Sequence, residues 1–313
     1  MKSSSPTRLT IGIPAYKNAL TLRTSVETLL AQTYGDFKIL ISDDNSPDDT
    51  QAVCLELASQ DSRIEYIRQP KNLKYQNFGF LLRSAKTEYF MWAAGDDRWH
   101  PDFVRSCIEV LDANPDIVLA TPRIEFEMKG KPTGLSNATF PLTGDVEDNI
   151  RRYLAAPGDN SRMYGVFRTE AGQRSFPLTS FHAYDLAFCA ATLRFGGHAE
   201  IPRVLMVRDQ TPGANYLLLV RADSTGTLSR LLPFFEMSRW LLQEAKIPRS
   251  SKMLGTLLAV NVDRHFWYTD YFHKTYTRIN QPIQAFWRRY VGWRLLEGRS
   301  NDSVSAVNTR ENR

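Results

Sequence analysis

Two short acidic segments of this chain combine residue types that can bind a metal ion and a phosphorylated ligand. Asp96 and Asp97 follow the apolar run 88–95, and the acidic turn 42–46 follows another apolar run in the same relation. Open parallel sheets bind ligands at the carboxyl ends of their strands. Two carboxylates on one loop suit a hard divalent cation that carries substrate phosphates. The combination indicates a metal-assisted enzyme that acts on a nucleoside diphosphate compound.

The elements that must position these carboxylates follow a strand–helix alternation, which predicts an α/β fold with a mainly parallel sheet flanked by helices. In the first 120 residues, strands are expected over 9–14, 37–42, 64–67, 88–94 and 117–121, and helices over 19–33, 47–57, 75–86 and 101–114. Further on, we expect a long loop over 129–145, helices near 146–156 and 181–195, strands near 163–168 and 201–208, and helical structure from 227 onward.

The composition is that of an ordinary globular protein. The chain has 313 residues, of which 42% are hydrophobic and 23% charged. No apolar stretch reaches the ~20 residues that a membrane helix needs, and residues 1–6 lack a secretory apolar segment. The expected location is therefore the cytoplasm. Cys54, Cys107 and Cys189 lie far apart in apolar patterns, which predicts buried reduced thiols.

The net charge of +5 is concentrated at the C-terminal end. Residues 274–313 contain eight Lys or Arg against three Asp or Glu, a surplus equal to that of the whole chain. The overlapping stretch 266–293 is rich in aromatic residues, and this mixture is typical of a helix that contacts a membrane surface. The alternative is a packed helical cap with a solvated basic face. Nucleic acid is considered and is not expected as a partner.

Four blocks of the sequence, in order, resemble the family 2 inverting glycosyltransferases of the A-type, or nucleotide-diphospho-sugar transferase, fold. They are residues 9–16 (LTIGIPAY), 29–37 (LLAQTYGDF), 41–50 (ISDDNSPDDT) and 88–101, which contains Asp96-Asp97. The resemblance is strong to about residue 120 and extends less specifically to about 210. It implies transfer of a sugar from a nucleotide diphosphate donor to an acceptor hydroxyl, with inversion and with Mg²⁺ or Mn²⁺ as cofactor.

The resemblance places the nucleotide base against Pro14, Ala15 and Tyr16 and makes Asp44 the acceptor of the base N–H. A carboxylate fixed at a strand end can accept that hydrogen bond, and an aromatic ring provides stacking. The alternative is that Asp43 or Asp44 only caps the turn and the following helix.

The resemblance also makes Asp97 the metal ligand and brings Asp96 to the sugar or ribose hydroxyls. Many family members have a further Asp two positions before the pair, where this chain has Ala94. One metal ligand of the family is therefore absent from the motif. The alternative is that the pair caps the helix that follows Pro101.

Asp185 is the expected catalytic base, because the family has an acid in such a context before a helix and a returning strand. A carboxylate there can take the proton from the attacking hydroxyl. Alternatively, Asp185 only stabilises the helix N-terminus through its charge. His182 is a rival base.

For the pyrophosphate we expect Lys74, Arg83 or Arg208 as the binding cation. Each of them can instead be an ordinary surface charge, and the family often has Gly at the position of Lys74.

We therefore predict a catalytic domain over 1–215, with a nucleotide-binding half (1–125) and an acceptor half (126–215), then a helical extension (216–300) and a disordered tail (301–313). The expected donor is a UDP- or dTDP-sugar, and the expected acceptor is a saccharide or a lipid-linked compound of surface polysaccharide or glycolipid synthesis. The enzyme would be cytoplasmic, with peripheral contact to the inner face of the plasma membrane.

The alternative function is a catalytically inactive sugar-binding or partner-binding protein. A nucleotidyltransferase is disfavoured, because residues 13–17 do not form a Gly-rich phosphate loop.

Overall fold

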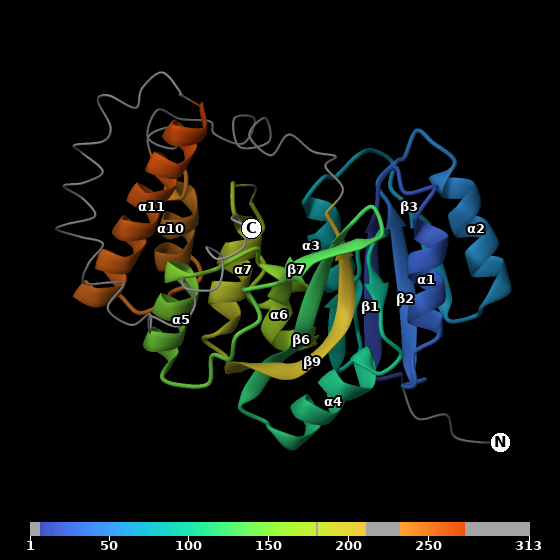
Figure 1. The fold of residues 1–313 in the computed structure, drawn as a ribbon, viewed down its shortest axis with the longest axis horizontal. Helices are drawn as coiled ribbons and strands as arrows, with labels where there is room; N and C mark the ends of the chain where they lie inside the picture. The colour runs from blue at the N-terminus through green and yellow to red at the C-terminus, as the bar shows by residue number, and fades with distance from the viewer. Residues whose placement is uncertain (1–6, 180, 211–231, 273–313) are drawn as a thin grey trace, which may run out of the picture.

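The computed structural model describes residues 7–179, 181–210 and 232–272 (Figure 1). Within these residues a single twisted sheet separates two groups of helices. The expected basic and aromatic tail over 274–313 lies outside the described residues.

The sheet is mixed but mostly parallel. Its order is β3-β2-β1-β4-β8-β6-β9-β5, and β7 pairs with β6 outside this path. β1 is parallel to β2 and β4, β2 is parallel to β3, and β6 is parallel to β9, whereas β8 is antiparallel to β4 and β6. The strands are β1 (Leu9–Ala15), β2 (Phe37–Asp43), β3 (Ile64–Arg68), β4 (Tyr89–Trp92), β5 (Arg98–Trp99), β6 (Ile117–Met128), β7 (Lys131–Leu135), β8 (Val166–Arg168) and β9 (Gly197–Asp209).

The helices follow the predicted order and the predicted α/β fold class is confirmed. They are α1 (Leu22–Leu30), α2 (Thr50–Gln60), α3 (Gln76–Ser84), α4 (Phe103–Ala113), α5 (Val146–Ala155), α6 (Thr169–Gln173), α7 (Tyr184–Thr192), α10 (Phe235–Gln243) and α11 (Ser251–Phe272), with a 3₁₀ helix, η1, over Ser161–Tyr164.

Alternate residues of the strands face two separate hydrophobic cores, as the period of two of a β-strand requires. Ile11 and Ile39 face one core, which α1, α2 and α4 cover. Leu40, Phe90 and Trp92 face the other core, which α3, α5, α7, α10 and α11 cover. The sheet is therefore buried on both faces and leaves its strand ends free for function.

Gly12 in β1 allows α3 to approach the sheet closely. A Cβ at Gly12 would lie 2.9 Å from Cζ of Phe90 and 3.1 Å from Cβ of Leu81. Only glycine therefore fits between β1 and α3 without displacing them.

The predicted long loop over 129–145 is wrong in its first part. β6 continues to Met128 and forms a hairpin with β7, and the two residues of its turn, Lys129 and Gly130, have positive φ angles of 50° and 76°. Two consecutive residues with positive φ are what a tight hairpin turn needs. The short elements β5, α6 and η1 were also not predicted.

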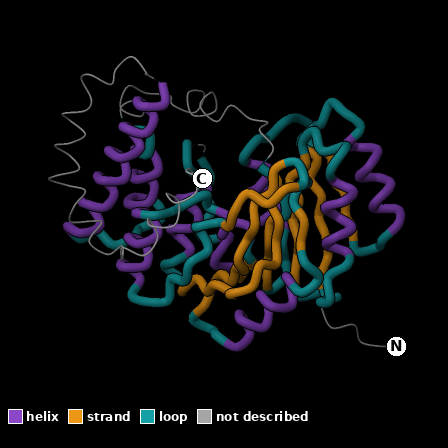
Figure 2. The backbone as a smooth tube through the Cα atoms, viewed as in Figure 1, coloured by secondary structure: helices purple, strands orange, loops and turns teal. Residues whose placement is uncertain are grey.

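Helices α5, α10 and α11 gather at the end of the molecule opposite α1 and α2 (Figure 2). The Nε atom of Arg151 in α5 donates to Oγ1 of Thr256 in α11 at 3.2 Å, and Met237, Leu241 and Met253 are buried in the same core as α7. The described part of the extension therefore shares the core of the sheet. No helix within the described residues is long and apolar enough to cross a membrane.

Candidate active site

The carboxyl ends of β1, β2 and β4 meet at one edge of the sheet. Ala15 at the end of β1 lies opposite Asp43 at the end of β2, and Gly12 lies opposite Trp92 at the end of β4. The acidic segments 42–46 and 96–97 therefore open at the same edge, as the sequence predicts. We call this edge the acidic edge.

Pro14 and Ala15 form the end of β1 at the acidic edge, and Tyr16 follows directly. The carbonyl oxygen of Ala15 accepts a hydrogen bond from the backbone N–H of Asp44 at 2.8 Å. The side chain of Tyr16 is 44% exposed, and Nζ of Lys17 lies 5.5 Å from the centroid of its ring. An exposed ring at a strand end is available for stacking against a base.

Asp44 is buried and joins two loops. Its carboxylate accepts hydrogen bonds from the backbone N–H groups of Leu73 and Lys74, the latter at 2.8 Å. Burial raises the pKa of Asp44, and these two hydrogen bonds partly offset the effect. A carboxylate has acceptor capacity for about four hydrogen bonds, so two donors do not saturate it. That Asp44 accepts a hydrogen bond from the N–H of the nucleotide base stays a prediction.

The neighbouring Asp43 is a structural residue of the same turn. It is fully buried and accepts hydrogen bonds from the N–H of Ser46 at 2.8 Å and from Nη1 of Arg68 at 2.9 Å. The hydroxyl of Tyr66 donates at 3.2 Å to Oδ2 of Asp43, the oxygen that Arg68 also contacts. The two adjacent aspartates therefore differ: Asp43 fixes the turn, and Asp44 faces the loop before α3.

Asp96 and Asp97 also differ in environment. Asp96 is exposed, whereas Asp97 is only 2% exposed. Oδ1 of Asp97 accepts from the backbone N–H of Asp209 at 3.2 Å, and the carbonyl oxygen of Asp97 accepts from Oγ of Ser25 at 2.7 Å. Burial raises the pKa of Asp97 to about 7, although the positive charge of Arg208 opposes the rise.

Arg208, at the end of β9, reaches Asp97 from another part of the sequence. Strand β5 follows Asp97 directly and pairs with β9, with Arg98 opposite Val207. Nε of Arg208 lies 3.3 Å from Oδ2 of Asp97, and Nη1 donates to Oγ of Ser161 at 2.9 Å. The structure thus joins the predicted metal ligand, Asp97, to Arg208, one of the cations predicted to contact the diphosphate.

Tyr164 lies among these charges. The guanidinium of Arg208 is 4.5 Å from the centroid of its ring. Burial raises the pKa of Tyr164, the charge of Arg208 opposes this rise, and the carboxylates of Asp97, Asp96 and Asp185 add to it. Tyr164 therefore lies within electrostatic range of the predicted metal ligand and of the predicted base.

Asp185 lies in the first turn of α7 and accepts a hydrogen bond from Nδ2 of Asn160 at 2.9 Å. The rival residue His182 is buried, with its ring centroid 5.6 Å from that of Phe234. Two cations around α3 were predicted to contact the pyrophosphate. Lys74 precedes α3 at the acidic edge, whereas Arg83 lies in the last turn of α3, roughly 13 Å further along the helix axis.

Sequence reasoning missed Asn160, Ser161 and Tyr164, which surround Asp185 and Arg208. The positive φ angles of Gly158 and Asn160 fit the turn chemistry of Gly-Asp-Asn, a signal that indicates a tight loop. No periodic pattern indicates which distant side chains that loop meets.

The carboxylates of the acidic edge are suited to a site in which protein carboxylates and substrate phosphates bind a divalent cation together. Among the described residues no group of three or more His, Cys, Asp and Glu could hold a metal by itself. Mg²⁺ is commonly bound by one or two carboxylates together with substrate phosphates and water. Asp97, with Asp96 beside it, provides such a partial set, and Ala94 explains why the set is small.

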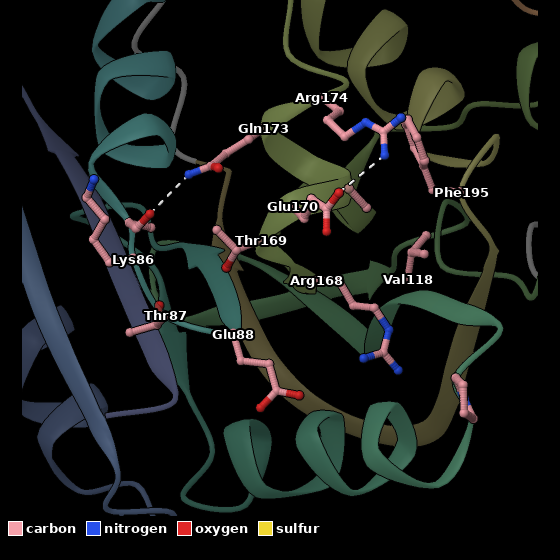
Figure 3. Close-up of a pocket in the computed structure, with 13 residues that line it drawn as sticks. Lys86, Thr87, Glu88, Val118, Arg168, Thr169, Glu170, Gln173, Arg174 and Phe195 are labelled. Atoms are coloured by element: carbon pink, nitrogen blue, oxygen red, sulfur yellow. Dashed lines mark hydrogen bonds and ion pairs between the residues drawn. The ribbon is translucent and has the colours of Figure 1, made fainter. Parts of the chain in front are cut away.

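A cavity of about 600 Å³ opens at the opposite edge of the sheet (Figure 3). Lys86, Thr87 and Glu88 line it before the start of β4, and Arg168 lines it at the end of β8. The guanidinium of Arg168 donates to the carbonyl oxygens of Ile117 at 2.9 Å and Leu111 at 2.7 Å, so it fixes the end of α4. This cavity is separate from the acidic edge, and we do not assign the reaction to it.

A mostly parallel sheet with carboxylates at the ends of its strands is typical of an α/β enzyme that binds a phosphorylated ligand, and comparison with known proteins identifies the family. The sequence profile of glycosyl transferase family 2 matches residues 10–176, which is more than half of the chain. The chain belongs to glycosyl transferase family 2. The family predicted from the sequence is therefore confirmed.

Curated relatives match only part of the chain. An uncharacterized glycosyltransferase of Rickettsia typhi is 28% identical over 113 residues, which cover 36% of this chain and 35% of that protein. The putative glycosyltransferase EpsH of Bacillus subtilis is 27% identical over 173 residues, which cover 53% of this chain and 49% of EpsH. The chain thus spans between a third and a half of the length of these relatives.

Solved structures share the fold over most of the chain. S. aureus TarS 1–349 in complex with UDP-GlcNAc has a TM-score of 0.61 at 16% identity, over 90% of this chain and 79% of that chain. The mannosyltransferase PcManGT of Pyrobaculum calidifontis, in complex with GDP-Man and Mn²⁺, has a TM-score of 0.53 at 13% identity, over 92% and 82% of the two chains.

Proposed function

We propose that this protein is a metal-dependent inverting glycosyltransferase that moves a sugar from a nucleotide diphosphate donor to an acceptor hydroxyl. The observation that carries the proposal is the arrangement around Arg208, which forms an ion pair with Asp97 and donates to Ser161. The residue before Ser161, Asn160, donates to Asp185 at 2.9 Å and so brings the proposed base to the same loop. A metal ligand, a phosphate-binding cation and a general base are the three groups that such a displacement needs.

A UDP- or dTDP-sugar is the proposed donor. Tyr16 offers an exposed ring for the base, and Pro14 and Ala15, which precede it in the sequence, are the proposed backbone neighbours of the base. Asp44 is the proposed acceptor of the imide N–H of the pyrimidine. Family membership supports a nucleotide sugar, since TarS is solved with UDP-GlcNAc and PcManGT with GDP-Man.

Mg²⁺ or Mn²⁺ is the proposed cofactor, with Asp97 as its ligand and Asp96 on the sugar or ribose hydroxyls. When bound, the cation would offset the negative charge that develops on the leaving diphosphate. Arg208 adds a fixed positive charge next to Asp97, and Lys74 is placed before α3 to add another. Mn²⁺ in the structure of PcManGT supports divalent metal use.

The proposed reaction is a one-step displacement. The Asp185 carboxylate takes the proton of the acceptor hydroxyl while the hydroxyl oxygen forms a bond to the anomeric carbon. The bond from that carbon to the diphosphate oxygen breaks on the opposite face, and its electron pair leaves with the nucleoside diphosphate. Configuration at the anomeric carbon is therefore inverted. Arg208 stays beside the departing charge.

The acceptor is proposed to be a saccharide or a lipid-linked compound of surface polysaccharide or glycolipid synthesis, met at the cytoplasmic face of the plasma membrane. The basic aromatic stretch 266–313 supports this location by its composition alone. Sedimentation with vesicles that contain anionic lipid tests it. Failure of the protein to sediment would remove the membrane contact but not the transferase activity. Residues 1–215 remain the proposed catalytic domain and 216–300 the proposed extension, and the predicted tail 301–313 lies outside the described residues.

The test of the function is a panel of nucleotide sugars assayed for hydrolysis and transfer, with and without Mn²⁺. We expect turnover of at least one UDP- or dTDP-sugar, loss of turnover in Asp185→Ala, and retained donor binding in that variant. The alternative is a binding protein without turnover. It is supported by Ala94, which stands where many family members have a further Asp. Binding of a nucleotide sugar without turnover across the panel would favour that alternative.

A further inference from the structure

Asn160 connects Asp185 to a buried tyrosine. Nδ2 of Asn160 donates to Oδ2 of Asp185 at 2.9 Å, and Oδ1 of Asn160 accepts from the hydroxyl of Tyr153 at 2.6 Å. The three side chains come from α5, from the residue before η1 and from α7. A chain of two hydrogen bonds thus runs from the interior to one oxygen of the proposed base.

The orientation of the Asn160 amide is fixed by its two partners. An ionised carboxylate only accepts hydrogen bonds, so the NH₂ group of Asn160 must face Asp185. The amide oxygen then faces Tyr153, whose hydroxyl must donate. Burial raises the pKa of Tyr153 well above its ordinary value, so this hydroxyl stays protonated. The chain of hydrogen bonds has one direction only.

The side chain of Asn160 does not serve its own helix. Asn160 occupies the residue before η1, where an Asn usually accepts a hydrogen bond from the first turn, but its side chain makes no such bond. Its backbone is in the left-handed region, with φ of 56° and ψ of 24°. Both ends of the amide are used for Tyr153 and Asp185 instead.

Tyr153 is itself rigidly packed. It is fully buried, and the guanidinium of the equally buried Arg162 lies 5.0 Å from its ring centroid and 4.8 Å from that of Phe140. Nη1 of Arg162 lies 3.1 Å from Nδ1 of His198, and Nη2 donates to the carbonyl oxygen of Phe140 at 3.1 Å. Arg162 is therefore fixed in position, and so is the hydroxyl that orients Asn160.

We propose that Asn160, oriented by Tyr153, is a positioning residue that fixes one oxygen of the Asp185 carboxylate and thereby directs the other oxygen to the acceptor hydroxyl. The inference rests on the proposed function, because it takes Asp185 as the base. Asn160 is not a catalytic residue in this account, since it touches Asp185 and not the reacting atoms.

The test uses Asn160→Gly and Tyr153→Phe. Glycine tolerates the left-handed backbone and deletes only the amide, and phenylalanine keeps the ring beside Arg162 and deletes only the hydroxyl. Lys129→Gly is the matched backbone control, because Lys129 also has a positive φ, of 50°, and lies in the β6–β7 turn. The substrate is the nucleotide sugar selected by the panel, and hydrolysis serves as the readout because water is then the acceptor.

We expect kcat to fall about 30-fold in Asn160→Gly, because misplacement of a reacting group by about 1 Å costs on the order of 100-fold. The dissociation constant of UDP with Mn²⁺ should stay within about twofold, because the change acts on the base and not on the donor. Tyr153→Phe should lower kcat about fivefold, and the double variant should be no slower than Asn160→Gly, because Tyr153 acts through Asn160.

Three results would overturn the proposal. They are kcat of Asn160→Gly equal to that of Lys129→Gly, additive losses in the double variant, or loss of UDP affinity in parallel with kcat. Asp185→Ala separates this failure from failure of the proposed function. If Asp185→Ala still turns over, the base assignment is wrong; if it is inactive while Asn160→Gly is unaffected, only the positioning role is wrong.

Discussion

Oδ2 of Asp97 lies 3.3 Å from Nε of Arg208, although 111 residues separate them in the sequence. The side chain of Asp97 is 2% exposed and that of Arg208 is 21% exposed, so the pair is largely removed from water. Desolvated ion pairs are costly to break on one side, because the remaining charge stays buried without a partner. The pair therefore links the proposed metal ligand to the end of β9.

Arg208→Gln should lower the free energy of unfolding by about 2 kcal/mol, because it leaves the Asp97 carboxylate buried without its cation. Urea denaturation of the metal-free protein measures this. Arg203→Gln is the control, since Arg203 lies on the same strand and pairs with Asp102 at 3.2 Å on the surface. An exposed pair contributes at most about 1 kcal/mol. Equal losses in the two variants would contradict the role given to Arg208.

The pH dependence of stability should report on Asp97. Its pKa is raised to about 7 in the folded state, above the value of about 3.9 expected for an unfolded Asp. The folded protein thus binds more protons between these values, and its stability falls as the pH rises through this window. Between pH 5 and pH 8 the free energy of unfolding of the unsubstituted protein should decrease. In Asp97→Asn this decrease should be smaller by on the order of 2 kcal/mol. Identical pH profiles for the two proteins would show that Asp97 titrates normally.

Tyr16→Ala should weaken UDP binding about tenfold, because stacking of a base on an aromatic ring contributes roughly 1–3 kcal/mol. Tyr16→Phe keeps the ring and should bind like the unsubstituted protein. Isothermal titration with Mn²⁺ present measures both. The melting temperature should not change, because this side chain is 44% exposed. Unchanged UDP affinity in Tyr16→Ala would show that the base is not bound at the end of β1.

Gly12→Ala should destabilise the protein by about 2 kcal/mol, because the added methyl group would lie 2.9 Å from the ring of Phe90 in β4 and 3.1 Å from Leu81 in α3, and must displace the ring or α3. Gly255→Ala is the matched control. A Cβ at Gly255 in α11 would have no atom within 4 Å outside its own helix. The free energy of unfolding of this variant should therefore rise by up to about 1 kcal/mol, because Ala favours a helix more than Gly does. Chemical denaturation of both variants gives the comparison, and a neutral Gly12→Ala would show that the β1–α3 contact is loose.

The sequence predicted most of the fold of the first 125 residues because its signals there are local. Helix α4, for example, shows apolar spacing at Val104, Ile108 and Leu111 after Pro101, and the structure has the helix over Phe103–Ala113. The acidic edge follows from the same local pattern, since parallel strands bring their carboxyl ends together.

The missing parts of the site depend on contacts between distant segments. Arg208 reaches Asp97 only because β9 pairs with β5, a strand of two residues with no period to detect. Asn160 reaches Asp185 through a left-handed turn whose partners its sequence does not specify. The β6–β7 hairpin replaces part of the predicted loop because Lys129-Gly130 forms a tight turn with two positive φ angles, and the same residue types also occur in longer loops.

Binding of UDP to the protein and to Asp97→Asn, measured by isothermal titration with and without Mn²⁺, tests the central claim most directly. We expect Mn²⁺ to strengthen UDP binding to the unsubstituted protein by at least about tenfold, and Asp97→Asn to lose this enhancement while it keeps its fold. Equal enhancement by Mn²⁺ in both proteins would contradict the account, because the diphosphate would then be bound away from the acidic edge.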